Sequence, residues 1–393
     1  MSAEDERPVF DVAIVGAGVS GLCLARALVE APETRGLAIL LVDGARDDDA
    51  LRTLSFWACG ETPLDGLVRH TWHALDVTRA DGVVTRAPLR EHRYRTLFLA
   101  DLRRDVTARL AASPRCRVID GRVGALRETT DHVEVDVAGD AWRARRVFDS
   151  RFRRGALAVD TRRWHLLWQH FQGWIVRASR DVFDPAAVRL FDFRTRLPSG
   201  TAFFYTLPFS AREALVEFVS LSPTDAASAL HDHLTRDVGL REGEWSVVAH
   251  EAGVSPMTEQ PFEGGVSPRI RAIGIAAGRL KPSTGYALTR ILDDSARVAA
   301  SLARRDARIA APPARPGYRF LDGVLLELWS SRPARIPAVF GAMFARNPAD
   351  RVLRFLDERA APGDLVAFMA TLPIGPLVWA ALRWLWRRLR ARG

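Results

Sequence analysis

Short apolar runs and one helical pattern open the chain. An apolar run over residues 10–15 precedes the segment GAGVSG, and apolar residues recur at helical spacing over 21–30. A second apolar run over 38–42 ends in Asp43, about twenty residues beyond the last glycine, where a dinucleotide fold places its ribose-binding acid. The order of strand, glycine turn, helix and strand predicts a Rossmann βαβ unit.

The later pattern is mostly of the strand type. Residues 45–95 are rich in aromatic and turn residues, 97–110 indicate a strand end and a helix, and 116–148 alternate like a β-meander. The segments GWIVRAS, VRLFDF, TAFFYTLP and EALVEFVSLS, between 156 and 222, indicate a second sheet. From 271 a strand is followed by a helix expected from about Ser283 to Arg304, and everything beyond Pro316 has a helical pattern.

These elements predict an α/β fold with three parts. They are a Rossmann-type FAD-binding domain of residues 1–150 plus 271–305, an inserted β-rich substrate domain of 151–270, and a helical C-terminal region of 306–393.

The glycine motif carries the first candidate site. Gly16 suits the tight turn, Gly18 the close approach of backbone to pyrophosphate, and Gly21 the packing of helix on strand, while Asp43 would bind a ribose hydroxyl. Free amides at the helix N-terminus would bind the phosphates. Because a β-rich insertion interrupts the fold before it is completed, FAD is favoured over NAD.

The chain returns to the first domain at a glycine-rich turn, GIAAGRLKPSTGYAL, which could place amides on a flavin ring or its ribityl phosphate. An ordinary helix start capped by Ser283 or Thr284 is the alternative. The cofactor candidates here are Gly278, Pro282, Ser283, Thr284, Gly285 and Tyr286.

Composition narrows the partners. The chain has a net charge of +9, and its positively charged side chains are almost all arginine. No nucleic-acid-binding motif accompanies this charge, so we expect no nucleic-acid partner. Cys23, Cys59 and Cys116 are scattered without CxxC spacing, so we expect no metal site and no disulfide. The acidic, polar N-terminal residues do not have the pattern of a secretion signal, and we expect a cytoplasmic protein.

Several segments together resemble the flavin-dependent lycopene β-cyclases of bacteria. They are DVAIVGAGVSGL, TLSFW, WQHFQGW, LFDF, FYTLPFSAREALVEF, GVSPMT, KPSTGY and FLDGVLL with FARNPADRVLRFLDE. The resemblance implies an intramolecular lyase of the isomerase class that forms β-ionone rings from the acyclic ends of lycopene. It also implies a requirement for reduced FAD, with NAD(P)H as the reductant, and no net redox chemistry.

Ring formation of this kind begins with protonation of an alkene, which needs an acid in an apolar pocket. The resemblance places the catalytic glutamate at Glu217, between Val216 and Phe218, and burial there would raise its pKa so that the neutral acid can donate. Alternation alone also permits Glu217 to face solvent. Glu213 is a weaker candidate on the same strand, and Asp192 could assist proton transfer.

Aromatic faces could stabilise the cationic intermediates at about 0.5–2 kcal/mol each. The substrate-binding candidates are Trp57, Trp174, Phe204 and Tyr205.

A long polyene must be taken from a membrane. No charged residue occurs over 365–382, and Pro373, Gly375 and Pro376 interrupt the run. This pattern favours an in-plane or partly embedded helix pair over a transmembrane span. Tryptophans would lie at the headgroups and arginines would meet anionic lipid; these are Trp379, Trp384, Trp386, Arg383, Arg387, Arg388, Arg390 and Arg392. We expect peripheral attachment, the alternative being a helix buried against the core.

Three other functions stay open at this stage. They are a cyclase of another polyprenyl substrate, an NAD(P)H-consuming flavin hydroxylase or polyprenyl reductase, and a flavin- or carotenoid-binding protein without turnover. The first is left open by Val219, Leu54 and the segment from Gly274 to Gly278, where this chain departs from the family's usual residues.

Overall fold

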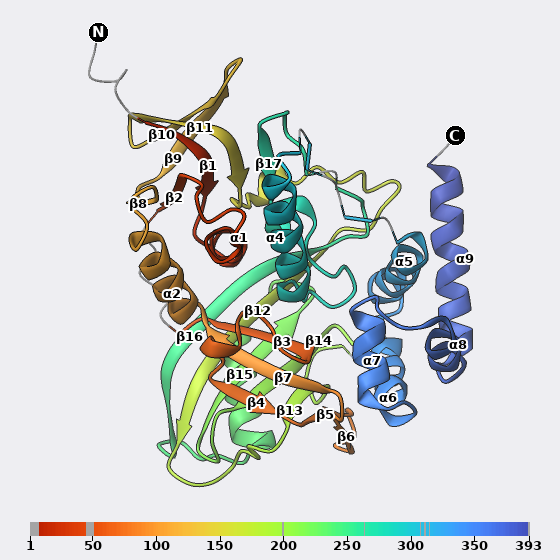
Figure 1. The fold of residues 1–393 in the computed structure, drawn as a ribbon. Coiled ribbons are helices and arrows are strands. Elements are labelled where there is room, and N and C mark those ends of the chain that lie inside the picture. The colour runs from red at the N-terminus through yellow and green to blue at the C-terminus, as the bar shows by residue number, and fades with distance from the viewer. Residues whose placement is uncertain are drawn as a thin grey trace.

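The described residues fold around three β-sheets, with helices on their faces (Figure 1). The computed structural model describes residues 8–44, 51–198, 200–262, 264–306, 308–309, 312–313 and 315–391 of the 393. Arg392, which the sequence suggests as a lipid contact, lies outside these residues.

The first sheet contains the predicted dinucleotide unit. Its central strand β1 is parallel to both β2 and β11, and it is almost wholly buried because it has neighbours on both edges. The sheet runs β8-β2-β1-β11-β10-β9, with β17 beside β11. The bounds are β1 (Val9–Val15), β2 (Ile39–Asp43), β8 (Arg117–Asp120), β9 (Val123–Glu128), β10 (Val133–Val137), β11 (Asp140–Asp149) and β17 (Ile270–Ala272).

Three helices accompany this sheet (Figure 1). They are α1 (Val19–Glu30), α2 (Leu99–Ala111) and α4 (Leu288–Ala303), and α1 packs against both of the others. The helix expected from 283 begins only at Leu288, because Gly285 has φ +80° and keeps the preceding residues in a loop. The expected strand after 270 is also short, ending at Ala272 before a 3₁₀ turn over Gly274–Ala277.

The second sheet has the order β16-β12-β15-β14-β13-β5-β6. Its bounds are β5 (Ala74–Thr78), β6 (Val84–Pro88), β12 (Leu167–Ala178), β13 (Val188–Asp192), β14 (Ala202–Pro208), β15 (Glu213–Ser220) and β16 (Trp245–Met257). A third sheet, β3-β7-β4, is formed by β3 (Thr53–Cys59), β4 (His70–Trp72) and β7 (His92–Phe98).

The second sheet differs from the expected division at residue 150. Strands β5 and β6 come from the 45–95 segment, yet β5 pairs with β13 and so belongs to the inserted sheet. Such pairing between distant segments leaves no local pattern in the sequence. The predicted boundary at residue 150 therefore does not separate the strands of the two sheets.

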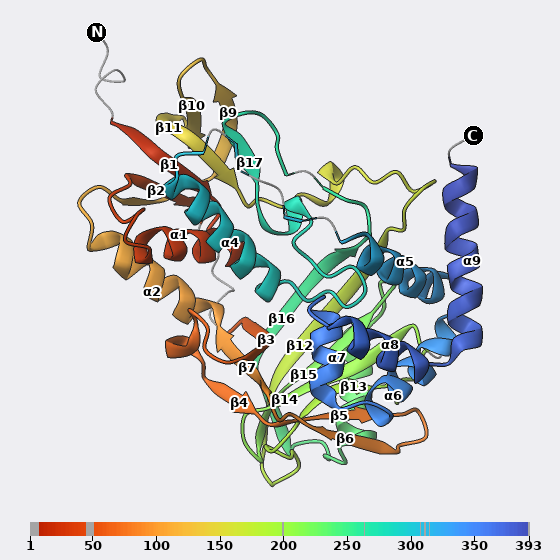
Figure 2. The same ribbon diagram turned by 45° about the vertical axis from the view of Figure 1, so that its right-hand side comes forward.

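The two faces of the second sheet pack on different helices. One face packs on α3 (Ala226–Asp232) and the π-helical turn His233–Asp237. The opposite face, called here the cavity face, packs partly on the C-terminal helices α5 (Pro316–Ser331), α6 (Ile336–Ala345), α7 (Ala349–Leu356), α8 (Pro362–Ala370) and α9 (Ile374–Arg390). Figures 1 and 2 both show these helices along one side of the sheet, with α9 outermost.

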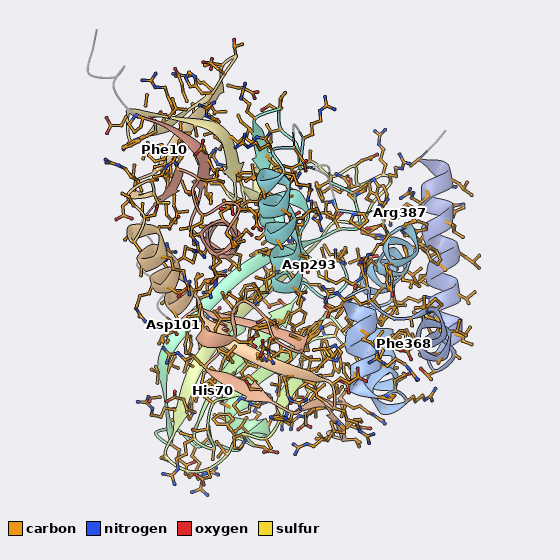
Figure 3. All side chains as sticks on the ribbon, in the orientation of Figure 1. Phe10, His70, Asp101, Asp293, Phe368 and Arg387 are labelled. Carbon is orange, nitrogen blue, oxygen red and sulfur yellow. The ribbon has the colours of Figure 1, made fainter. Side chains whose placement is uncertain are left out.

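The C-terminal helices are held by both apolar and charged contacts. Phe368 of α8 is fully buried and stacks on Phe355 of α7 with ring centroids 4.3 Å apart (Figure 3). Arg387 lies on the side of α9 that faces α5, where it contacts Glu327 (Figure 3). In the described part of the chain no single helix is long and apolar enough to cross a membrane, and α8 with α9 meets that criterion only as a pair bent by 113°.

Three residues expected at the lipid surface make contacts with the protein. Trp384 is buried, and its indole N–H donates to Glu259 at 3.0 Å. Arg383 and Arg387 both contact the buried Glu327. Trp384 therefore faces the protein, whereas the side chains of Arg383 and Arg387 stay 48% and 31% exposed while they pair with Glu327. The spacing of tryptophan and arginine in the sequence does not distinguish the two faces of α9.

Candidate functional site

A cavity of about 1080 Å³ lies between the first sheet and the cavity face of the second. Gly16, Gly18 and Asp43 line one end of it, and Tyr205 and Glu217 line the other. The dinucleotide motif and the predicted acid are therefore parts of one continuous space.

The three glycines of the motif have the geometry expected of them. Gly16 directly follows β1 with φ +91°, a conformation that other residues rarely adopt, and it lines the cavity. Gly18 has open space where a Cβ would stand. A Cβ on Gly21 would lie 1.9 Å from the carbonyl oxygen of Gly16, so only glycine lets α1 pack this closely on β1.

Asp43, at the end of β2, lines the cavity as predicted. Its Oδ1 accepts the backbone N–H of Ala17 at 3.0 Å, and its Oδ2 accepts from Arg103 at 2.6 Å. The carboxylate is therefore held between the glycine turn and α2, and the second of these contacts was not predicted.

The loop before α4 is anchored from outside the cavity. Lys281 is buried, and its Nζ lies 2.8 Å from Asp322 of α5 and 3.0 Å from Glu358. This ion-pair cluster directs the next residues inward, so that Thr284, Gly285 and Tyr286 line the cavity. The Thr284 hydroxyl is buried and has no hydrogen-bond partner among the described residues.

Three tyrosine hydroxyls meet at the inner end of the cavity. Tyr94 lies 2.7 Å from Tyr205 and 2.8 Å from Tyr286, measured between hydroxyl oxygens. Burial, above all other causes, raises the pKa of all three, so they stay neutral and act as hydrogen-bond donors. Trp57 packs behind Tyr286 with ring centroids 4.5 Å apart and does not itself line the cavity.

Glu217 projects from β15 into this inner end. Its surroundings are apolar, with Phe191, Phe203 and Val219 among the lining residues. Burial raises the pKa of Glu217 well above its usual range, and the nearby charge of Glu251 raises it further. Glu217 therefore keeps its proton to a higher pH than an exposed glutamate would.

Glu251 of β16 is a site residue that the sequence did not single out. It lines the same cavity and hydrogen-bonds to Glu217. Its carboxylate accepts the backbone N–H of Thr53 at 2.8 Å and the Thr53 hydroxyl at 3.1 Å. Glu251 lies two residues before the GVSPMT segment, and only the pairing of β16 with β12 brings it to Glu217.

Comparison with known proteins bears on this geometry. The family model described as lycopene cyclase protein matches residues 11–382. The chain belongs to the lycopene cyclase family. A protein of Deinococcus radiodurans described as an uncharacterized carotenoid cyclase is 29% identical over 254 residues, which are 59% of this chain and 60% of that protein.

Solved structures similar to this lycopene cyclase family member show its fold. A geranylgeranyl bacteriochlorophyll reductase-like protein from Thermoplasma acidophilum has a TM-score of 0.62 at 12% identity, covering 94% of this chain and 98% of its own. A triple mutant of a flavin-dependent brominase has a TM-score of 0.61 at 14% identity, covering 92% and 98%. The α/β flavoprotein fold with a helical C-terminal region is thus confirmed.

The cavity of this cyclase-family protein fits an FAD molecule in its chemistry. A halogenase mutant solved in complex with FAD has the same fold, with a TM-score of 0.58 at 13% identity and coverage of 89% and 82%. Here the open space above Gly18 would admit the pyrophosphate, and Asp43 would meet the ribose. The unpartnered Thr284 hydroxyl and the amides around Gly285 would face the flavin end.

Several predicted site residues lie elsewhere. Trp174 and Phe204 are on the opposite face of the second sheet, packed in the cluster around α3. Gly278, Pro282 and Ser283 flank the cavity without lining it, and Gly278 ends the 3₁₀ turn with φ +70°.

Asp192 is also outside the cavity. It pairs with Phe204 in the β13–β14 ladder and so shares the face that packs on α3. Its carboxylate is fully buried and accepts two hydrogen bonds from Arg194, at 2.6 and 2.9 Å. The β-bulge between Arg189 and Asp192 alters the alternation, so the sequence could not give the direction of this side chain.

Proposed function

We propose that this protein cyclises the acyclic ends of a carotenoid such as lycopene to β-ionone rings. The reaction would be initiated by a proton, would need FAD in its reduced form with NAD(P)H as the reductant, and would involve no net redox change. Such an enzyme is a lycopene β-cyclase, an intramolecular lyase of the isomerase class.

The position of the Glu217 carboxyl in an apolar part of the cavity, where burial raises its pKa, is the observation that carries this proposal. Alkene protonation needs a group that keeps its proton near pH 7 and then gives it to a poor base. The hydrophobic lining from Leu190, Phe191 and Phe203 suits a hydrocarbon chain and excludes water, which would otherwise capture a carbocation.

Other residues of the chain would hold and orient the reacting end. The hydroxyls of Tyr205 and Tyr286 cannot lose protons at working pH, and their ring faces can stabilise positive charge at about 0.5–2 kcal/mol each. Reduced FAD, when bound, would supply negative charge beside the carbocation.

Anaerobic incubation with FAD, dithionite and lycopene tests the proposal. The product should have the mass of lycopene and a changed absorbance spectrum, whereas a hydroxylase or a reductase would change the mass. Glu217→Gln should lower kcat by about 10²–10⁴-fold, because glutamine cannot act as a general acid.

Glu213→Gln is the matched control for that variant. Glu213 begins the same strand, but it pairs with the exposed Arg177 at 2.8 Å and lies outside the cavity. This variant should keep wild-type activity. Recovery of unchanged lycopene with a flavin-loaded wild-type protein would refute the proposed function.

We also propose that the protein is cytoplasmic and attaches peripherally to membranes through α8 and α9. Apolar side chains at Ile374, Val378, Leu382 and Leu389 are all at least half exposed and recur at helical spacing along α9. Trp386 is exposed beside them, and Arg390 stacks on its ring at 3.6 Å. An apolar face bordered by arginine suits an anionic lipid surface.

Sedimentation with anionic liposomes tests this attachment. Val378→Glu places a charge in the exposed apolar face and should weaken binding, while Val248→Glu makes the same exchange at a site of similar exposure on β16 and should not. Equal binding of the two variants would contradict attachment through α9.

A further inference from the structure

Four residues form one row across the second sheet. Tyr205 pairs with Glu217 between β14 and β15, Glu217 pairs with Gly173 between β15 and β12, and Gly173 pairs with Glu251 between β12 and β16. Directly paired residues point to the same face of a sheet. The two glutamates therefore rise from the cavity face on either side of Gly173.

The glycine leaves the space in which the two carboxyls meet. A Cβ at position 173 would lie 2.8 Å from the Cδ1 of Leu215, 3.2 Å from the Cγ of Glu251 and 3.5 Å from the Cβ of Glu217. Any larger side chain would stand between the acids, which belong to strands that are not adjacent. Glycine is otherwise unfavourable inside a strand, so its presence here needs a local reason.

The partners of the two acids differ. Glu251 accepts two hydrogen bonds from Thr53, and such bonds favour an ionised carboxylate. For Glu217 the hydrogen bond is to Glu251 itself. A single shared proton is consequently best placed on Glu217, donated toward an ionised Glu251.

Few other charges face this pair. Arg52, beside Thr53, lowers the pKa of both acids, although burial outweighs it at each of them. Tyr205 and Tyr286 face the pair from β14 and from the loop before α4, and both are neutral.

We propose that Glu251 is a positioning residue that keeps one shared proton on Glu217, so that Glu217 acts first as the acid and then as the base of ring formation. This inference rests on the proposed cyclisation. It explains how one carboxyl can do both jobs.

The proton balance closes within the pair. The O–H bond of Glu217 breaks and a C–H bond forms on the terminal alkene, which leaves a tertiary carbocation. The π electrons of the next alkene form the ring C–C bond, and the cation moves to a ring carbon. A neighbouring C–H bond then gives its electrons to a new C=C bond, and its proton returns to Glu217. Two carboxylates this close cannot both stay ionised, so the return is favoured.

The pH profile of kcat separates this role from a structural one. Glu251→Gln removes the negative charge beside Glu217, so Glu217 loses its proton more easily and the alkaline limb should shift down by about one pH unit or more. Thr53→Ala removes the hydroxyl that donates to Glu251, so the pair of acids stabilises negative charge less well. Loss of the second proton from the pair then needs a higher pH, and the alkaline limb should shift to higher pH. Glu213→Gln should leave the limb in place.

Infrared titration of the protonated carboxyl band gives a readout that does not need turnover. Near pH 7 the holoprotein should show a protonated carboxyl band that Glu217→Gln removes and that titrates at lower pH in Glu251→Gln. If Glu251→Gln does not fold, the opposite shift in Thr53→Ala carries the test.

The outcomes separate the two proposals. Unchanged pH limbs and an unchanged infrared titration in Glu251→Gln and Thr53→Ala, with Glu217→Gln inactive, would overturn the pairing and leave the cyclase intact. Absence of cyclisation by the wild type, with the infrared shifts present, would overturn the cyclase and leave the shared proton established.

Discussion

Replacing His165 with phenylalanine removes the centre of a buried charge network at the C-terminal helices. The imidazole Nδ1 lies 2.9 Å from Glu259 and the Nε2 lies 2.9 Å from Glu327. Both ring nitrogens must carry hydrogen to bond two carboxylates, so His165 is an imidazolium. All three side chains are buried.

The expected loss of stability follows from the hydrogen-bond and charge partners that Glu259 and Glu327 retain in the variant. Glu327 retains Arg383 at 2.9 Å and Ser331 at 2.7 Å, so its charge stays largely compensated. The donors that the described residues give Glu259 besides the imidazole are neutral, namely the backbone N–H of residue 165 and the Trp384 indole. Removing one partner of a buried ion pair costs about 3–5 kcal/mol, and with Glu327 compensated we expect about 3 kcal/mol.

The pH dependence has a definite sign. Burial would lower the pKa of His165, but the hydrogen bonds that its ring donates to Glu259 and Glu327 outweigh it and raise that pKa above 6.5. The contribution of the imidazolium is therefore complete below about pH 6.5 and is lost as the pH rises through the folded-state value.

The contribution of Glu327 to stability depends on pH in the opposite direction. Burial would raise the pKa of Glu327, but hydrogen bonds from His165, Ser331 and Arg383 lower it to about 2. Its contribution is present above its ordinary value of 4.5 and is lost as the pH falls toward 2. The difference between wild type and variant should be largest from about pH 4.5 to 6.5.

Urea unfolding measures the loss, and amide exchange in α9 locates it. His231→Phe is the matched control, because that histidine is exposed and pairs with the exposed Glu242. It should change the unfolding free energy by less than about 0.5 kcal/mol. A loss below about 1 kcal/mol in the His165 variant, or unchanged exchange in α9, would refute a network that fastens this helix.

Three further substitutions follow from the geometry. Gly21→Ala puts a Cβ 1.9 Å from a backbone oxygen at the end of β1, so α1 must shift, and the purified protein should lose most of its flavin absorbance. Lys281→Met leaves the buried Asp322 without its cation; unfolding should become easier by about 3–5 kcal/mol, as measured by urea titration. Asp192→Asn should weaken folding and leave kcat unchanged, because its partner is an arginine outside the cavity; a large fall in kcat in a folded protein would restore Asp192 as a catalytic group.

Local patterns were enough to predict the parts of the fold that depend on near neighbours. The glycine turn, the buried central strand and the helix after it are all within thirty residues, and each follows from spacing and burial. The sheet around Glu217 was also predicted as strands, and the acid does face the cavity.

The side-chain directions on those strands were harder to predict. Phe204 and Tyr205 are consecutive on β14, so a regular strand can point only one of them into the cavity, and it points Tyr205. The choice between them depends on which face the distant α3 covers, and nothing in the TAFFYTLP segment itself reveals that.

The acid pair shows why the rest of the site could not be found from local sequence. Glu217 and Glu251 are 34 residues apart in the chain, with α3 between them, and Thr53 comes from the first quarter of it. They meet only when β12 is placed between β15 and β16 with Gly173 opposite both acids. A shift of one residue in either pairing would turn an acid to the opposite face of the sheet. The protonation state proposed for Glu217 is therefore a property of strand register, and a sequence comparison that aligns Glu217 alone does not establish it.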